Sequence, residues 1–165
     1  MAAESPPADD NPRLAFIYGE AVRGLVQQQA QLESLHARAG TLIFATSFVS
    51  SLLGGRALSD GLDPWDWAAI ALLFGIGALA VVLLWPYYNF FFRFDARDLL
   101  ATYVDADPKV TLAEMHRRLA IRIEDDRERN GRIIRRLREA LQVALVLLLF
   151  EILAWLFSIS QVAAN

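Results

Sequence analysis

Three stretches of the chain consist mostly of apolar residues: 40–57, 64–88 and 139–164. A helix needs about 20 such residues to cross the ~30 Å hydrocarbon core of a bilayer. The second and third stretches reach this length, and the first reaches it only if its helix extends to about Ala57. We therefore predict three transmembrane helices. For each of them, a helix buried in the core of a water-soluble protein is the alternative.

Apolar residues also recur at seven-residue intervals between residues 14 and 53. One heptad position holds Leu14, Ala21, Gln28, Leu35, Leu42 and Val49, and a second holds Tyr18, Leu25, Leu32, Ala39, Thr46 and Leu53. Such a repeat keeps one seam of a helix facing a partner helix. Because the repeat passes unbroken from residues 13–39 into the first span, we expect one continuous helix with a helical partner. A single amphipathic helix on the membrane surface is the alternative.

Local signals mark where the second span begins. Asp63 can cap a helix, Pro64 suits the first turn, and Asp66 places a further acid near the positive helix end. Residues 58–63 are therefore expected to form a short external loop.

The region 89–138 is expected to be helical, with a turn at 105–110. The sequence from Thr111 to Glu114 has the form of a capping box, which predicts the start of another helix there. The Asn-Gly dipeptide at 130–131 is either a hinge or a true break, and we favour a kinked but continuous helix.

Composition supports membrane insertion. The chain has 165 residues, the length of one domain, and 55% of them are hydrophobic, which is more than a soluble domain of this size usually carries. Residues 1–12 contain acids and prolines and lack a basic start or an apolar run. They are expected to be a disordered tail and not a signal peptide.

Charge is distributed unevenly between the connections. Residues 93–138 carry twelve Lys or Arg, whereas residues 56–66 carry one Arg and three Asp. Because positive segments stay on the cytoplasmic side, we expect a multi-pass protein of the bacterial inner membrane with a cytoplasmic N-terminus and an external C-terminus. The expected fold class is an all-α integral membrane protein, in which three transmembrane helices with long cytoplasmic helical extensions form a hairpin bundle.

Residue types that carry catalysis are sparse. The chain has no cysteine and two histidines, His36 and His116, and neither histidine has a second histidine or a carboxylate pair at ligand spacing. Both histidines are expected at the solvated surface. We therefore expect no enzymatic activity and no catalytic, cofactor-binding or metal site.

Glu151 is the exception in the apolar pattern, because it lies in the middle of the third span. A carboxylate there costs about 3 kcal/mol on insertion scales, so it should face protein or water and find a partner. Ser51 lies as many residues beyond Arg38 as Glu151 lies beyond Arg138. We therefore expect a protonated Glu151 to hydrogen-bond an intramembrane polar cluster, whose other members are Thr46, Ser47, Ser50, Ser51 and Ser158. The cluster is either an interhelical pin or part of a pore or proton-accessible path.

Two further sets of residues are candidate contact surfaces. The small residues Ala68, Ala71, Gly75 and Ala78 form a ridge along the second span, of the kind that lets membrane helices approach closely. The basic residues Arg132, Arg135, Arg136 and Arg138 precede the third span. They are expected to contact anionic lipid headgroups or simply to anchor the span, and no nucleic-acid partner is expected.

Several short motifs resemble small three-span bacterial membrane proteins of uncharacterised function. The motifs are YGEAVR at 18–23, QQQ at 27–29, RAGTL at 38–42, SFVSSLLGG at 47–55, WPY at 85–87 and EMHRRLA at 114–120. A helix that leads into two close spans and then a helical segment is also similar to the SLATT proteins. That resemblance implies a two-span effector of bacterial conflict systems, proposed to form membrane pores when a nucleotide-sensing partner is triggered. The third span has no counterpart in the SLATT pattern.

The leading hypothesis is a non-enzymatic inner-membrane helical protein that self-associates through its heptad helix and its spans. It would act as a pore-forming or membrane-perturbing effector of SLATT type. The alternative is a small structural or regulatory subunit of a larger membrane complex, docked through its cytoplasmic helices. The expected partners are the lipid bilayer, further copies of the chain and, for the alternative, an unidentified protein.

Overall fold

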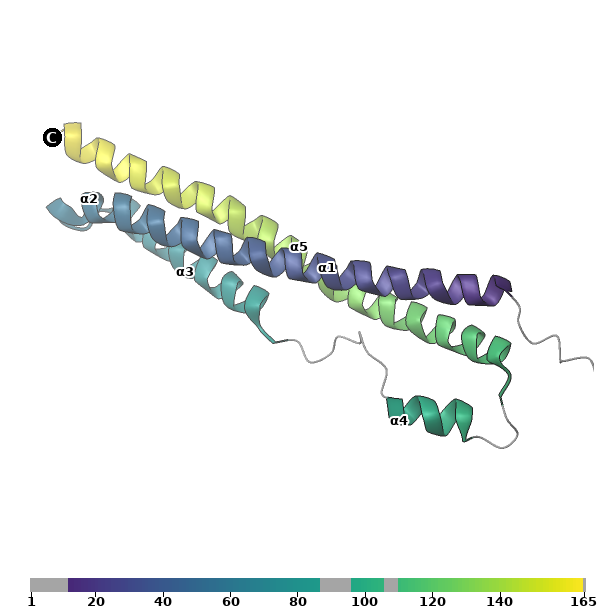
Figure 1. Cartoon of the computed structure of the whole chain (residues 1–165). Coiled ribbons are helices and arrows are strands. Elements are labelled where there is room, and N and C mark those ends of the chain that lie inside the picture. Colours follow the sequence, from purple (N-terminus) through teal and green to yellow (C-terminus); the bar gives the residue numbers. More distant parts are fainter. Residues whose placement is uncertain (1–11, 87–95, 106–109, 165) are drawn as a thin grey trace, which may run out of the picture. The chain divides into compact units, whose positions relative to one another are not determined.

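The computed structural model describes residues 12–86, 96–105 and 110–164, and every regular element in these ranges is helical. The long helices are α1 (Pro12–Val49), α3 (Pro64–Leu84) and α5 (Leu112–Ala164) (Figure 1). The helical segments Pro12–Ala57, Pro64–Leu84 and Leu112–Gln161 are each long and apolar enough to cross a membrane. The prediction of an all-helical chain with three candidate spans is confirmed. The expected tail at 1–12 lies almost wholly outside the described residues.

Helical structure continues beyond α1 as far as Ala57. A π-helical turn, η1 (Ser50–Gly54), follows α1 directly and leads into the short helix α2 (Gly55–Ala57). A 3-10 turn, η2 (Leu58–Asp60), and Gly61 with a φ of 110° then reverse the chain. The helix therefore extends as far as the first candidate span requires.

Helix α3 begins at the predicted start signal. An Asp63 side-chain oxygen accepts a hydrogen bond from the backbone N–H of Asp66 at 2.8 Å, and the Asp66 carboxylate accepts one from the N–H of Asp63 at 2.9 Å. The helix ends at Leu84, a few residues before the predicted boundary. Trp85 has an extended ψ of 132°, because a following proline such as Pro86 disfavours helical geometry in the residue before it.

Helix α5 also begins at its predicted cap. The hydroxyl of Thr111 accepts a hydrogen bond from the N–H of Glu114 at 3.2 Å. The helix then runs without a break through Asn130 and Gly131, so the continuous alternative is correct. Two short helical segments, α4 (Ala96–Leu99) and η3 (Leu100–Val104), precede it in the chain.

The chain divides into two compact units, and α1 and α5 contribute to both. The first unit consists of the described parts of residues 1–31 and 87–133, and the second of those of residues 32–86 and 134–165. In the first unit Leu25, Leu119 and Ile123 are buried. There the amide of Gln28 donates to the backbone carbonyl of Arg127 at 2.8 Å, which joins α1 to α5.

An ion pair joins α4 to α5 within the first unit. Arg122 Nη1 lies 2.8 Å from Asp98 Oδ2, and both side chains are about half exposed. The hydrogen bond to Asp98 raises the pKa of the Arg122 guanidinium above its ordinary value. A cation whose pKa is higher in the folded chain than in the unfolded chain stabilises the fold at every pH below its pKa in the unfolded chain. This stabilisation is lost only in strong alkali. The pair is therefore independent of pH near neutrality, and its exposure keeps its contribution small.

The two histidines are less solvated than predicted. His116 is half-buried and stacks on Tyr18, with ring centroids 5.2 Å apart. His36 is also half-buried, and its Nε2 atom is buried without a hydrogen-bond partner among the described residues. Both histidines are therefore less exposed than expected, and for His116 the reason is its stacking on Tyr18.

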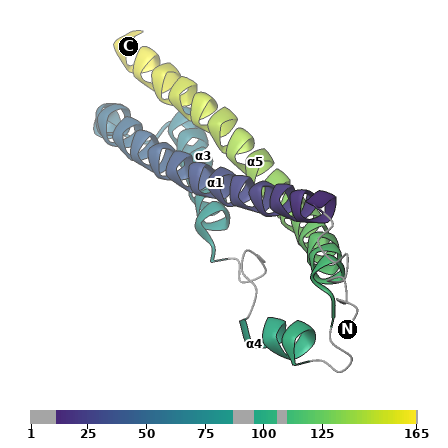
Figure 2. The same cartoon turned by 45° about the vertical axis from the view of Figure 1, so that its right-hand side comes forward.

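In the second unit α1 and α5 run in the same direction (Figure 2). Successive residues of α5 meet successive residues along the first span: Glu151 is hydrogen-bonded to Ser50, and Trp155 lies against Gly54. A Cβ atom at Gly54 would lie 3.2 Å from the indole ring, so the absence of a side chain allows this close approach.

Helix α3 runs in the opposite direction to both of these helices. Leu147 of α5 lies next to Gly75, whereas Ser158, further along α5, is hydrogen-bonded to Asp66 near the start of α3. Residues further along α5 thus meet residues closer to the start of α3, as expected for an antiparallel helix that follows the short connection at 58–63.

The predicted heptad seam of α1 is the face that the chain covers. All twelve seam residues between 14 and 53 are buried or half-buried in their own unit. The contacts of Gln28 and Ser50 described above show that α5 of the same chain supplies partners on this side of the helix. A helical partner for the heptad helix is therefore present within one chain.

Candidate functional site

Glu151 lies in the second unit with none of its surface exposed. Its Oε1 atom accepts two hydrogen bonds, one from the hydroxyl of Ser50 and one from the indole N–H of Trp155 at 3.3 Å. Its Oε2 atom is buried and has no hydrogen-bond partner among the described residues. A buried polar atom without a partner is costly, so Oε2 is the atom of this site that can gain most from binding a further group.

The structure brings one of the four predicted hydroxyls of the first span to Glu151. Ser50 donates the hydrogen bond, and Thr46, one turn earlier, is buried but has no partner for its Oγ1 atom among the described residues. Ser47 and Ser51 lie on the exposed face of the helix. Counting residues from Arg38 and Arg138 therefore predicted the partner of Glu151 to within one residue. Ser50 is the partner and Ser51 is not, because Ser51 lies on the exposed face of the helix.

Ser158 belongs to a second polar pair and not to the contacts of Glu151. Its hydroxyl donates to Asp66 Oδ1 at 2.7 Å, and neither side chain is exposed. Ser158 lies seven residues beyond Glu151, which is about 10.5 Å along a helix. From the sequence, Asp66 is expected only as an acid near the positive end of the helix. Its complete burial was not predicted.

A buried apolar cluster lies between the two polar pairs. Ala57, Ala69, Ala154 and Trp155 form one buried cluster. The three alanines come from α2, α3 and α5, and larger apolar side chains, including Leu53, Ile70 and Ile159, pack against the cluster.

A heptad on α5 would have located these residues in the sequence. Asn130, Leu137, Ala144, Glu151 and Ser158 follow one another at intervals of seven, and all five are buried. The many charged residues between 124 and 139 obscure the repeat. With the repeat recognised, Glu151 is a seam residue that must face a partner helix, and Asn130 and Ser158 are polar members of the same seam.

The predicted small-residue ridge is not the buried face of α3. Ala71 and Ala78 are exposed and Ala68 and Gly75 are half-buried. The buried residues of this helix are Asp66, Ala69, Ile76, Ala80 and Leu83. The helix therefore packs within the chain through a neighbouring face, and the ridge is left largely uncovered.

The four arginines before the third span are exposed along α5. Arg132, Arg135, Arg136 and Arg138 extend over two turns of the helix. Their exposure leaves the guanidinium groups accessible, and contact with anionic headgroups stays a prediction.

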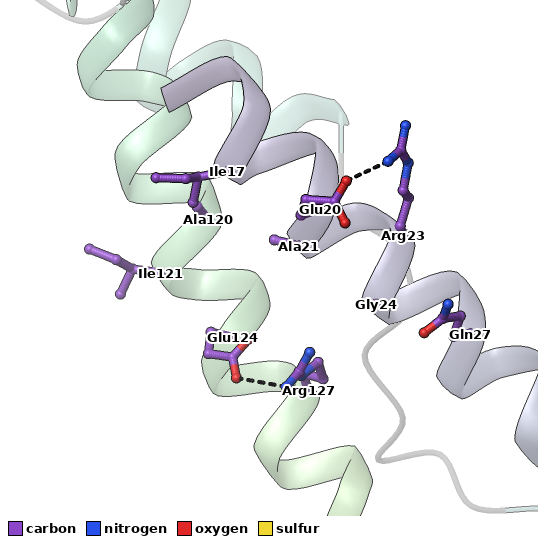
Figure 3. Close-up of a pocket in the computed structure, with 10 residues that line it drawn as sticks. All are labelled: Ile17, Glu20, Ala21, Arg23, Gly24, Gln27, Ala120, Ile121, Glu124 and Arg127. Atoms are coloured by element: carbon purple, nitrogen blue, oxygen red, sulfur yellow. Dashed lines mark hydrogen bonds and ion pairs between the residues drawn. The ribbon is translucent and has the colours of Figure 1, made fainter. Parts of the chain in front are cut away.

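A cleft of about 530 Å³ lies in the first unit between α1 and α5 (Figure 3). Its apolar lining includes Ile17 and Ile121, which are 52% and 57% exposed. Two ion pairs border it, Glu20 with Arg23 on α1 and Glu124 with Arg127 on α5. The cleft thus combines an apolar centre with a rim of balanced charge.

Within the described ranges, no three His, Cys, Asp or Glu side chains gather as they would around a metal ion. The buried carboxyl groups are surrounded by hydroxyl, indole and backbone N–H donors.

Comparison with protein-family models, with curated proteins and with solved structures finds no match for this chain. What the chain does is therefore inferred from its fold and its site. Together they define an all-helical chain with three candidate membrane spans and a polar core in the second unit.

Proposed function

We propose that the chain is a non-enzymatic protein of the bacterial inner membrane that associates with copies of itself and perturbs or perforates the bilayer, as a SLATT-type effector would. The N-terminus and residues 89–138 are cytoplasmic, and the C-terminus is external. The concentration of basic residues between 93 and 138 supports this orientation.

The uncovered surface of the spans supports a membrane location. Within the most apolar window of each candidate span, 22%, 22% and 28% of the residues are buried inside the chain. Large apolar side chains such as Phe44 and Phe74 are 72% and 75% exposed. In a bilayer these surfaces face lipid or a neighbouring copy.

The proposed self-association is supported mainly by two exposed hydroxyl groups on the first span. Ser47 and Ser51 are one turn apart and lie among exposed apolar residues, including Phe48 and Leu52. Membrane helices associate through small and hydroxyl-bearing residues, because a hydroxyl in hydrocarbon gains from a partner on another helix. Since the heptad seam is covered within the chain, the face with Ser47 and Ser51 is available to a second copy.

Dye leakage from liposomes that contain the purified chain tests this function. The wild type is compared with the double variant S47L/S51L and with the matched control S160L. Ser160 is also exposed, but its hydroxyl donates to the carbonyl of Phe157 on its own helix. We expect leakage from the wild type and the control, and a loss of most leakage in the double variant.

Two results would contradict the proposal. A wild type that causes no leakage at any protein-to-lipid ratio argues against perforation. Equal leakage from the double variant and the wild type argues against association through this hydroxyl face.

The cleft in the first unit favours a second candidate function, a structural or regulatory subunit of a larger membrane complex. A helix of a partner protein could place apolar side chains on Ile17 and Ile121 and charged ones on the rim. A photo-crosslinking residue at position 121, with an equivalent one at the exposed Glu128 as control, tests this in cells. A specific adduct that contains a different protein supports the subunit, whereas adducts between copies of the chain support the effector.

A further inference from the structure

Glu151 combines complete burial with an oxygen atom that the protein leaves without a partner. Ser50 and Trp155 both donate to Oε1, so both protein hydrogen bonds can persist whether or not Oε2 carries a proton. Thr46 Oγ1, on the turn of α1 next to Ser50, is the second buried polar atom here without a protein partner. A proton on Oε2 neutralises the carboxylate and leaves the existing hydrogen bonds in place.

The surroundings of Glu151 contain no other charge. Within residues 39–55, 67–84 and 140–161, which belong to the three helices of the second unit, Glu151 is the only titratable side chain. Arg56, Asp63 and Asp66 follow at one end of these segments. His36, Arg38, Arg135, Arg136, Arg138 and Glu139 lie at the other end.

The two ends differ in what separates them from Glu151. Towards Arg138, α5 buries Ala144, Leu141 and Leu137 in succession, and α1 buries Leu42, Ala39 and Leu35. These apolar layers extend over 13 residues, or about 20 Å. Towards the opposite end lies the buried cluster of Ala57, Ala69, Ala154 and Trp155, against which larger apolar side chains such as Leu53 and Ile159 pack. Beyond this cluster the polar pair of Ser158 and Asp66 follows seven residues from Glu151, or about 10.5 Å, which is roughly half the apolar distance to Arg138. Asp63, which shares the capping box with Asp66, is only half-buried.

We propose that Glu151 is a proton-binding site that exchanges with the aqueous phase on the side of the 58–63 connection, and not with the opposite side. A proton from water enters on the side of Asp66 and the hydroxyl of Ser158, water that penetrates between the helices carries it past the apolar cluster, and it binds Oε2. Its release reverses these transfers. The inference depends on the membrane location proposed above, but it holds whether or not the chain perforates the bilayer.

Trp155 provides a direct readout, because its indole N–H is bonded to the carboxyl group in question. A variant with Phe at Trp65, Trp67 and Trp85 keeps Trp155 as the single tryptophan. In nanodiscs, which have no lumen and therefore do not depend on leakage, its emission is titrated at equilibrium and followed after a rapid pH change. Adding E151Q to this variant keeps an acceptor for Ser50 and Trp155 and removes the titrating group.

We expect the fluorescence emission of Trp155 to change with pH, and we expect E151Q to abolish this pH dependence. S158A should slow the response to the pH jump severalfold with an unchanged final amplitude, whereas the control S160A should leave the rate unaltered. Circular dichroism of each variant verifies that the helices are intact.

An emission that does not change with pH, or that changes equally in E151Q, would overturn the proton-binding site. If S158A and S160A both respond at the wild-type rate, the site stands and the route through Ser158 and Asp66 is refuted. Neither result depends on the liposome leakage experiment, so the failure of one proposal is distinguishable from the failure of the other.

Discussion

Glu151 illustrates how a single acidic side chain is accommodated among apolar residues. Two donors from different helical turns converge on one of its oxygen atoms, Ser50 from the first span and Trp155 from its own helix. A hydrogen bond between membrane helices typically stabilises by about 1 kcal/mol. The contact therefore fixes the register of two helices more than it stabilises them.

The Ser50 contact can be tested against the serine next to it. S50A removes the donor to Glu151 and should lower the free energy of unfolding by about 1 kcal/mol. S51A removes an exposed hydroxyl from the same helical segment and should leave the stability of the single chain unchanged, when micelles are in such excess that copies of the chain are separated. Unfolding of both variants in detergent micelles by a chemical denaturant gives the comparison, and equal stabilities would show that the Ser50 bond contributes nothing.

Gly54 and Gly55 offer a second matched pair. A methyl group at Gly54 meets the Trp155 ring at 3.2 Å, whereas one at Gly55 meets nothing within 4 Å. G54A should therefore destabilise by about 1–3 kcal/mol through overpacking. G55A should be neutral or stabilising by up to about 1 kcal/mol, because alanine favours a helix. Thermal unfolding measures both, and a G54A variant as stable as the wild type would show that the ring can move aside.

Among the elements, α1 was the most predictable and α5 the least. The heptad of α1 is visible as a run of apolar letters, and its seam is the covered face of the helix. On α5 the same repeat includes Asn130, Glu151 and Ser158, so hydrophobicity alone conceals it. The helix start at Asp63 was predictable from local chemistry, but the burial of Asp66 was not, because it depends on Ser158, 92 residues away in the chain.

The start of α3 carries a prediction of its own. D63A removes the cap and should cost about 1 kcal/mol, and D63S should restore most of the loss. D66A also leaves the buried hydroxyl of Ser158 without an acceptor, so it should cost more, about 1–3 kcal/mol in total. Denaturant unfolding gives the order of the three variants. A D66A variant no less stable than D63A would mean that the Ser158 bond is replaced by another.

At the scale of the whole molecule, the structure separates two kinds of surface. The second unit exposes large apolar side chains around a core with two buried carboxyl groups, whereas the first unit combines exposed apolar side chains such as Ile17 and Ile121 with ion pairs on its surface.

The orientation can be measured directly, because the chain has no cysteine. Single cysteines at Ser59, in the connection between the first two spans, and at Ala101, in η3, are both at exposed positions. For the proposed orientation, a membrane-impermeant maleimide should label S59C in spheroplasts, and A101C only after the membrane is permeabilised. Labelling of A101C in intact spheroplasts would invert the proposed topology.

The π-helical turn at Ser50–Gly54 has a consequence for how the first span ends. A π turn holds one residue more than the α-helical path that the heptad assumes, so it acts as a one-residue insertion in the repeat. Continued unchanged, the repeat would direct Arg56 inward after Leu53. After the insertion Gly54 and Ala57 are buried, and Arg56 is exposed. The extra residue thus moves the buried positions of the repeat one residue further along the chain. As a result, Ala57 faces the core in place of Arg56.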